Sequence, residues 1–89
     1  MHLNPEYSIC EVMGRSFLVP TGSATMDVDK MMDLNDTSLY IINCLKEKDL
    51  SFDKILGSVL DEYEIDEKIA AEDISEFLDK AMKAGIVLS

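Results

Sequence analysis

The fold is decided by a stretch near the start of the chain, from Tyr7 to Pro20, whose sequence is YSICEVMGRSFLVP. Both halves contain β-branched and aromatic residues, and Met13-Gly14 between them is suited to a two-residue turn. Pro20-Thr21-Gly22-Ser23 adds turn residues at the end of the stretch. The sequence therefore predicts a β-hairpin with strands over residues 7–12 and 15–20.

A short third strand is expected after a loop that runs from Ala24 to Asp29. This strand covers Lys30–Leu34, and strand alternation places Met32 and Leu34 on one face. Methionine and aspartate are weak strand formers, which makes this the least marked of the three strands. If it lies at the edge of the sheet, its unpaired N–H and C=O groups invite a further strand.

The remainder of the chain predicts three helices. Asn35, Ser51 and Asp66 are residue types that cap helix starts, and Gly85 stands where the last helix should stop. The first helix is apolar nearly all round and is expected to be central. The other two helices carry apolar stripes at helical spacing, namely Phe52, Ile55, Leu56, Val59, Leu60 and Tyr63, and Ile69, Ala70, Ile74, Phe77, Leu78, Ala81 and Met82.

This order of elements predicts an α+β fold of winged-helix-like architecture, in which a three-stranded antiparallel sheet is followed by a three-helix bundle. The length of 89 residues corresponds to one domain over residues 1–89. We expect residues 1–6 to be flexible and Ile86-Val87-Leu88 to pack against the core.

Composition limits the classes of partner. The net charge is −10, from 18 acidic and 8 scattered basic residues, which argues against nucleic acid and against an anionic membrane surface. No apolar run approaches the ~20 residues that span a bilayer, and the first residues lack the features of a signal peptide. The two cysteines are expected to be reduced, so the expected location is cytoplasmic. A protein or peptide partner is the natural class.

Residues for catalysis are scarce. The only histidine is His2, and Cys10 and Cys44 have no basic neighbour in sequence that would produce a reactive thiolate. The sequence contains no phosphate-binding glycine motif, and its acidic clusters lack the spacing of a calcium-binding loop. We therefore expect no catalytic site, no metal and no cofactor.

Two features of the third helix bear on binding. Asp73 borders the apolar stripe, either as a structural carboxylate with a hydrogen-bonded partner, which we favour, or as a polar contact in a groove. Methionines on the third strand, beside Phe77 and Met82 on the helix, suit either core packing or an adaptable peptide-binding surface. An edge strand beside such a helix is suited to β-augmentation, in which a peptide adds as a further strand.

The chain resembles the PqqD-like family over nearly its whole length, from about Tyr7 to Leu88. The run from Cys10 to Gly22 resembles the opening hairpin of that family, and Leu34-Asn35-Asp36-Thr37 resembles its turn into the first helix. The remaining segments that carry the resemblance are Glu62-Tyr63, Ile65-Asp66, Glu72-Asp73-Ile74, Phe77-Leu78 and Ala84-Gly85-Ile86-Val87.

The resemblance implies a non-catalytic peptide chaperone, a recognition element for ribosomally made precursor peptides such as those of coenzyme PQQ synthesis. Such a domain binds the leader of the precursor and presents the core to a modifying enzyme, often a radical S-adenosylmethionine protein. The leader adds as an antiparallel strand to the third strand and packs on the third helix. On this chain the implied peptide-binding residues are Lys30, Met31, Met32, Asp33, Leu34, Phe77, Lys80, Ala81 and Ala84.

The chain departs from the family in two respects. It has no tryptophan, whereas many relatives carry one in the first helix, and it is strongly acidic although family leaders are often acidic in part. Lys30, Lys80 and Lys83 are the basic residues near the implied groove, so they would attract an acidic leader, while the surrounding acids would steer a basic one. The alternatives are a winged-helix regulator that binds DNA and a structural protein or homodimer that pairs its own edge strands.

Overall fold

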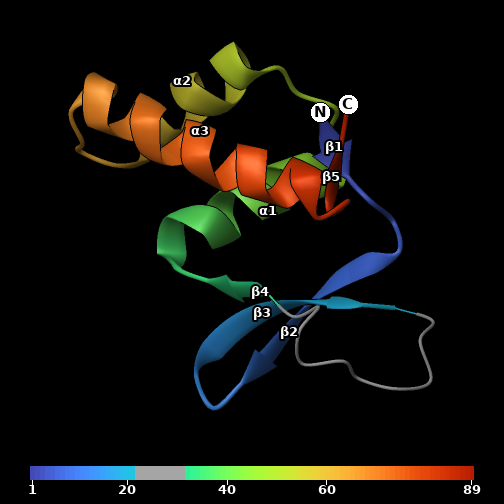
Figure 1. Ribbon diagram of the computed structural model, residues 1–89. Coiled ribbons are helices and arrows are strands. Elements are labelled where there is room, and N and C mark those ends of the chain that lie inside the picture. Colours follow the sequence, from blue (N-terminus) through green and yellow to red (C-terminus); the bar gives the residue numbers. More distant parts are fainter. Residues whose placement is uncertain (22–31) are drawn as a thin grey trace.

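The computed structural model describes residues 1–21 and 32–89. In this part of the chain, three helices lie on one side of a small antiparallel sheet (Figure 1). The elements in chain order are β1 (His2–Leu3), β2 (Tyr7–Val12), β3 (Arg15–Pro20), β4 (Met32–Leu34), α1 (Asp36–Glu47), α2 (Phe52–Glu62), α3 (Glu67–Lys83) and β5 (Val87–Leu88). The predicted α+β architecture of a three-stranded antiparallel sheet and three helices is confirmed.

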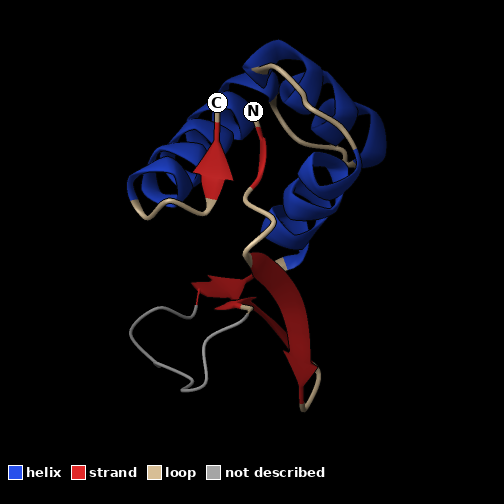
Figure 2. Cartoon of the chain, turned by 90° about the vertical axis from the view of Figure 1, so that its right-hand side faces the viewer, coloured by secondary structure: helices blue, strands red, loops and turns tan. Residues whose placement is uncertain are grey.

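The hairpin of β2 and β3 has the predicted bounds and projects away from the helices (Figure 2). Met13 and Gly14 form its turn with φ angles of 52° and 79°, so both residues adopt the left-handed conformation that a tight two-residue turn requires. Glycine adopts it freely, whereas a methionine there costs roughly 1–2 kcal/mol. The Met13 side chain gains no burial in return, because it is 97% exposed.

β4 pairs antiparallel with β3 and completes the sheet in the order β2-β3-β4. It contains the last three residues of the predicted third strand, while Lys30, Met31 and the loop expected over residues 24–29 lie outside the described residues. Met32 is half-buried, Asp33 exposed and Leu34 buried, which agrees with the predicted alternation.

The predicted helix caps are confirmed. Side chains of Asn35, Ser51 and Asp66 accept hydrogen bonds from backbone N–H groups in the first turns of α1, α2 and α3. At the end of α3, Gly85 has a φ of 76° and its N–H donates to the Met82 carbonyl, while the N–H of Ile86 donates to the Ala81 carbonyl. This pair of hydrogen bonds is a Schellman motif. The motif requires a left-handed backbone conformation at this position, which glycine adopts at little cost in free energy.

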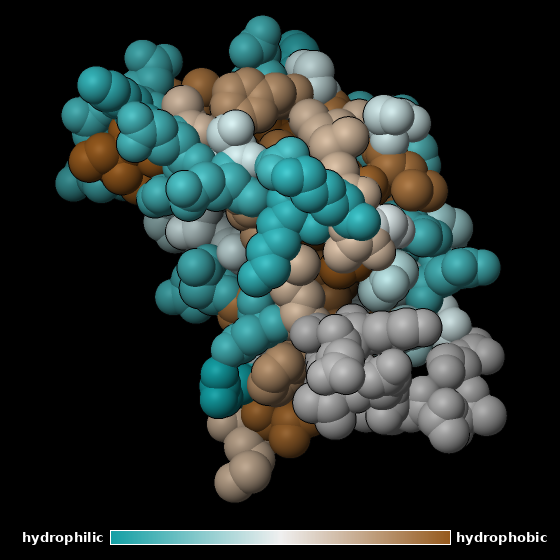
Figure 3. Space-filling view, in the orientation of Figure 1, coloured by the Kyte–Doolittle hydropathy of each residue, from teal (hydrophilic) through white to brown (hydrophobic). Residues whose placement is uncertain are grey.

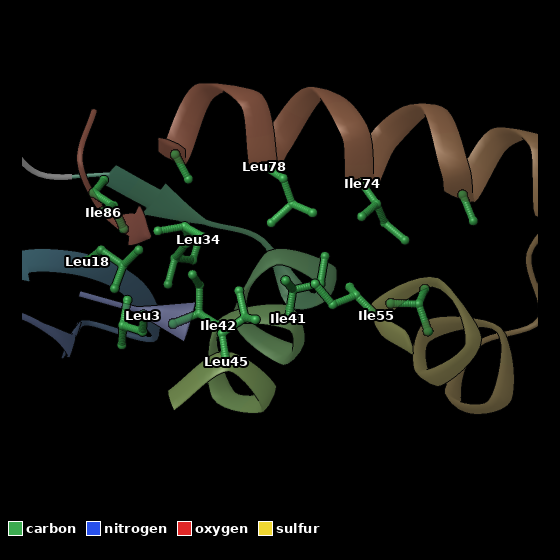
Figure 4. Close-up of a cluster of buried hydrophobic side chains, with 14 residues drawn as sticks. Leu3, Leu18, Leu34, Ile41, Ile42, Leu45, Ile55, Ile74, Leu78 and Ile86 are labelled. Carbon is green, nitrogen blue, oxygen red and sulfur yellow. The ribbon is translucent and has the colours of Figure 1, made fainter. Parts of the chain in front are cut away.

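One apolar core joins the sheet to all three helices (Figure 4). α1 lies centrally, as predicted, and contacts β1, β4 and α2. Each aliphatic side chain removed from water contributes about 1.5–3 kcal/mol, and the core contains many of them. Those exposed by 2% or less, and largest by volume, are Leu18, Ile41, Ile42, Leu45, Ile55, Ile74, Val59 and Val87.

The first residues, which we expected to be flexible, instead form a second, two-stranded sheet with the end of the chain. β1 pairs antiparallel with β5, with Leu3 opposite Val87. Asn4 extends the contact, since its backbone N–H donates to Ile86 and its side-chain amide to Gly85, each over 2.8 Å. A two-residue strand has too short a pattern to be recognised in sequence, and its partner lies at the far end of the chain. The prediction that the apolar tail packs against the core is confirmed, because Ile86 and Val87 are buried.

Within the described residues, no helix is both long enough and apolar enough to cross a membrane.

Candidate functional site

β4 is an edge strand. The sheet order places β3 on one side of it, and no described strand lies on the other. In the register of the pair, Leu18 lies opposite Met32 and Ser16 opposite Leu34. An uncovered edge presents backbone donors and acceptors to any extended segment that approaches it.

The register also determines which backbone groups face that edge. Val12 and Arg15 close the two-residue hairpin as a hydrogen-bonded pair, and such pairs alternate along an antiparallel ladder. The even-numbered residues of β3 therefore direct their N–H and C=O groups toward β4, where their partners are Met32 and Leu34. It follows that the N–H and C=O of Asp33, between those partners, point to the open edge.

A groove of about 460 Å³ lies beside this edge, between β4, the start of α1 and α3. On the face seen in Figure 3, hydrophilic side chains lie over α3, and apolar surface is visible between them. The residues that line the groove are Met32, Asp33, Asn35, Thr37, Ser38, Ile41, Val59, Ile65, Ala70, Asp73, Ile74, Glu76, Phe77 and Lys80.

The floor of the groove is apolar. Ile41, Val59 and Ile74 are each exposed by 1% or less, and half-buried Ile65 and Phe77 lie higher in the groove. These residues come from three helices and the loop before α3, so the floor exists only when the helices are packed. A bound side chain would gain apolar contact mainly at half-buried Ile65 and Phe77, which still expose apolar area, whereas the three floor residues have almost none left to remove from water.

The rim along α3 is charged. Asp73, Glu76, Phe77 and Lys80 lie on one face of the helix, at positions i, i+3, i+4 and i+7. Within the described residues, no ion pair joins Asp73, Glu76 or Lys80 to another side chain, whereas the next lysine, Lys83, pairs with Asp79 at 3.0 Å. The rim charges are therefore available to a ligand.

Asp33 has a partner of its own. Its carboxylate forms an ion pair and hydrogen bond with the guanidinium of Arg15, which also lies 5.5 Å from the centre of the Phe17 ring. Leu34 is in the core, so strand alternation places the Asp33 side chain on the opposite face of the sheet. The charge of Asp33 is thus partly neutralised.

The structure brings together four of the residues that the sequence singled out, since Met32, Asp33, Phe77 and Lys80 all line the groove. Leu34 and Ala81 are core residues, 6% and 0% exposed, and support the groove from behind without lining it. Ala84 is the exposed C-cap of α3 and is also not a lining residue. Lys30 and Met31 lie outside the described residues.

Asp73 differs from the interpretation that we favoured. Its side chain is exposed, lines the groove and has no hydrogen bond or ion pair within the described residues, so the structural role is not supported. Sequence reasoning also missed Glu76, although this residue shares a helical face with Asp73 and Lys80. The contributions of Asn35, Thr37 and Ile65 come from loops and helix starts, whose arrangement no periodicity predicts.

His2 and the cysteines lie away from this groove. His2 is in β1, where its Nδ1 lies 3.8 Å from a carboxylate oxygen of Asp49. Cys10 and Cys44 are free thiols, and neither lines the groove. Among the described lining residues, the groups able to act are carboxylates, hydroxyls, one amide and one lysine, which suits binding through charge and hydrogen bonds.

Comparison with known proteins gives one structural neighbour and one family. The chain resembles a solved structure described as "TbiB1 in Complex with the TbiA(beta) Leader Peptide", with a TM-score of 0.71 and 16% sequence identity, over 97% of this chain and 93% of that one. At this identity the likeness shows a shared fold. No curated protein matches the sequence. The family model for coenzyme PQQ synthesis protein D matches residues 18–87, which is most of the chain. The chain therefore belongs to the PqqD family.

Proposed function

We propose that this protein is a non-catalytic recognition module for the leader segment of a ribosomally made precursor peptide. The leader adds as an antiparallel strand to the open edge of β4, and its side chains enter the groove beside α3. The observation that carries the proposal is the juxtaposition of an edge strand with a groove of about 460 Å³ that has an apolar floor.

The backbone and the groove would contribute in different ways. Within described β4, Asp33 offers one outward N–H and one outward C=O, and a net gain of about 1 kcal/mol per hydrogen bond is too little for stable binding. Successive side chains of a strand alternate between faces, so the peptide residues on either side of the one paired with Asp33 would share the face of Met32 and Leu34. The backbone would therefore fix the register, and the groove would supply most of the affinity.

Two comparisons support this proposal. Family membership associates the chain with proteins of coenzyme PQQ synthesis, and the structural neighbour was solved with a leader peptide bound. We further propose that the bound precursor is presented to a separate modifying enzyme, either a radical S-adenosylmethionine protein or another peptide-modifying enzyme, in the cytoplasm. The domain itself would need no cofactor for this role.

The test uses isotope-labelled protein and the short peptides encoded next to its gene. Binding of one such peptide should shift the amide signals of Met32–Leu34 and of residues 73–80, and leave those of β1 and β5, which do not line the groove, unchanged. Shifts confined to other residues, or no shift with any of these peptides, would contradict the proposal.

A pair of variants at Asp33 tests strand addition directly. Asp33→Pro removes the outward N–H. Proline is tolerated on an edge strand at a position whose N–H points away from the neighbouring strand, as that of Asp33 does within the described sheet. Asp33→Ala removes the same carboxylate but keeps the N–H, and serves as the control. We expect Asp33→Pro to weaken peptide binding several-fold more than Asp33→Ala. Equal affinities would show that the peptide binds without pairing to this edge.

A further inference from the structure

The two ends of the groove rim on α3 have opposite charge. Asp73 and Glu76 lie toward the start of the helix, and Lys80 follows Glu76 by four residues, which is about 6 Å along the axis. Because Asp33 is paired with Arg15 and Lys83 with Asp79, the unpaired charges among the described lining residues are these three. The rim is therefore acidic at one end and basic at the other.

The acidic end also has an apolar floor. Ile41, Val59 and Ile74 are almost fully buried beneath it, and Asp73 and Glu76 stand exposed at its margin. Arginine and lysine combine a long apolar stem with a cationic tip, and such side chains bury the stem while the charge stays at the surface. A basic side chain matches both features of this end, whereas a carboxylate would be repelled by the rim.

The direction of the bound strand follows from the fold. β4 runs opposite to α3 in Figures 1 and 4, and Leu34 lies nearer to Leu78 than to Ile74 in Figure 4, so the chain of β4 runs toward the start of the helix. A strand that pairs antiparallel with β4 therefore runs in the same direction as α3. Its N-terminal part would lie beside Asp73 and Glu76, and its C-terminal part beside Lys80.

We propose that the groove selects a peptide strand with an arginine or lysine followed, two residues later, by an acidic residue. The basic side chain contacts Asp73 and Glu76, and the acidic one faces Lys80. Residues two apart on a strand share a face and lie about 6.5 Å apart, close to the ~6 Å rise from Glu76 to Lys80. The inference rests on the proposed function, and it specifies the chemistry of the ligand.

The rest of the protein favours a basic residue in the ligand. The net charge of −10 attracts a cationic segment from a distance and adds to the local contact. A leader that is acidic throughout would meet two rim carboxylates and one lysine, with the whole domain repelling it. The charges of the rim therefore favour a leader with a basic residue over a leader that is acidic throughout, the two possibilities that the sequence left open.

The experiment selects binders from a displayed library of random decapeptides on immobilised protein. We expect enrichment of peptides with a basic residue two positions before an acidic one, and depletion of the reverse order. For a selected peptide, the Asp73→Asn/Glu76→Gln variant should bind about five- to tenfold more weakly, since two partly exposed ion pairs are lost. Lys80→Glu should shift the selection toward peptides with two basic residues.

The matched control is Asp61→Asn/Glu72→Gln, which removes the same two charges from exposed positions that do not line the groove. It should keep the charge order in the selection and lower the affinity less than twofold. If both double variants weaken binding equally, overall charge and not the groove selects the peptide, and the inference fails. The inference also fails if the enriched peptides lack a basic residue two positions before an acidic one. If those peptides nevertheless shift the amide signals of Met32–Leu34, the proposed strand addition is still supported. A library that yields no binder contradicts the proposed function itself.

Discussion

The guanidinium of Arg15, on β3, forms an ion pair with the carboxylate of Asp33, on the edge strand β4. The pair joins the two strands on the face of the sheet away from the helices, while the backbone of Asp33 points to the open edge. The side chain and the backbone of Asp33 therefore face different surroundings. The carboxylate pairs with the neighbouring strand, whereas no described strand pairs with the N–H and C=O.

This ion pair should contribute little to stability. The two side chains are 66% and 54% exposed, and such pairs contribute roughly 0.2–1 kcal/mol to the free energy of unfolding. We expect Arg15→Gln and Asp33→Asn to show a coupling in that range in a double-mutant cycle measured by urea denaturation. Additive effects would mean that the pair does not hold β4 in solution.

The hairpin turn should be improved by one substitution. Met13 adopts a left-handed conformation with its side chain 97% exposed, and asparagine adopts that conformation at lower cost. We expect Met13→Asn to raise the free energy of unfolding by about 0.5–1 kcal/mol and to leave peptide binding unchanged, because the turn lies outside the groove. A destabilised variant would show that the turn differs from the one described.

Two helix caps offer a matched pair of variants. Asn35 and Ser51 both accept a first-turn N–H, but only Asn35 lines the groove. Asn35→Ala and Ser51→Ala should each lower the free energy of unfolding by about 1 kcal/mol, as judged by thermal denaturation. Only Asn35→Ala should weaken the binding of a selected peptide. A similar loss of affinity in both would indicate that the effect comes from reduced stability.

Phe77 should act mainly in binding. It is half-buried on the groove face of α3, whereas Met82, 42% exposed on the same helix, does not line the groove. We expect Phe77→Ala to weaken peptide binding at least tenfold, a change of about 1.4 kcal/mol, and Met82→Ala to leave it unchanged. Titration calorimetry measures both, and an unchanged affinity in Phe77→Ala would place the ligand elsewhere.

Tyr40 gives a prediction for alkaline pH. Burial raises the pKa of its hydroxyl above the ordinary value of 10.0, and neighbouring Cys44 and Glu62 raise it further. The native state therefore keeps a proton that the unfolded state has lost, so stability falls as the pH rises above about 10. The free energy of unfolding of Tyr40→Phe should decline less over this range than that of the original protein. Identical declines would exclude Tyr40 as the cause.

Local features of the fold were predictable because they depend on near neighbours in sequence. The bounds of the hairpin, the three N-caps and the stop at Gly85 each follow from a few adjacent residues. The pairing of His2–Leu3 with Val87–Leu88 was not predictable, because two-residue strands carry no periodicity and their partners are far apart in sequence.

The lining of the groove was predictable only in part. Met32 and Phe77, which the strand edge, the helix stripe and the family resemblance singled out, line the groove, whereas Leu34 and Ala81 are core residues. For Asp73 the sequence favoured a structural role over a polar contact in a groove, because its neighbours at helical spacing are apolar. The exposure of the side chain distinguishes these two roles. That exposure depends on how far the neighbouring elements extend over the helix, which the spacing of residues along the sequence does not reveal.

The sequence by itself determined the order of the hairpin, the third strand and the three helices, the caps, the central place of the first helix and the acidic character of the whole domain. Each of these depends on local backbone preference, on apolar periodicity or on composition. The tertiary structure decided that β4 lies at the edge among the described strands and that α3 runs antiparallel to it. It also decided that the carboxylates of Asp73 and Glu76 and the ammonium of Lys80 border one groove with an apolar floor. The reason is that a groove is the space left between packed elements, so its shape and charge exist only once distant segments have come together.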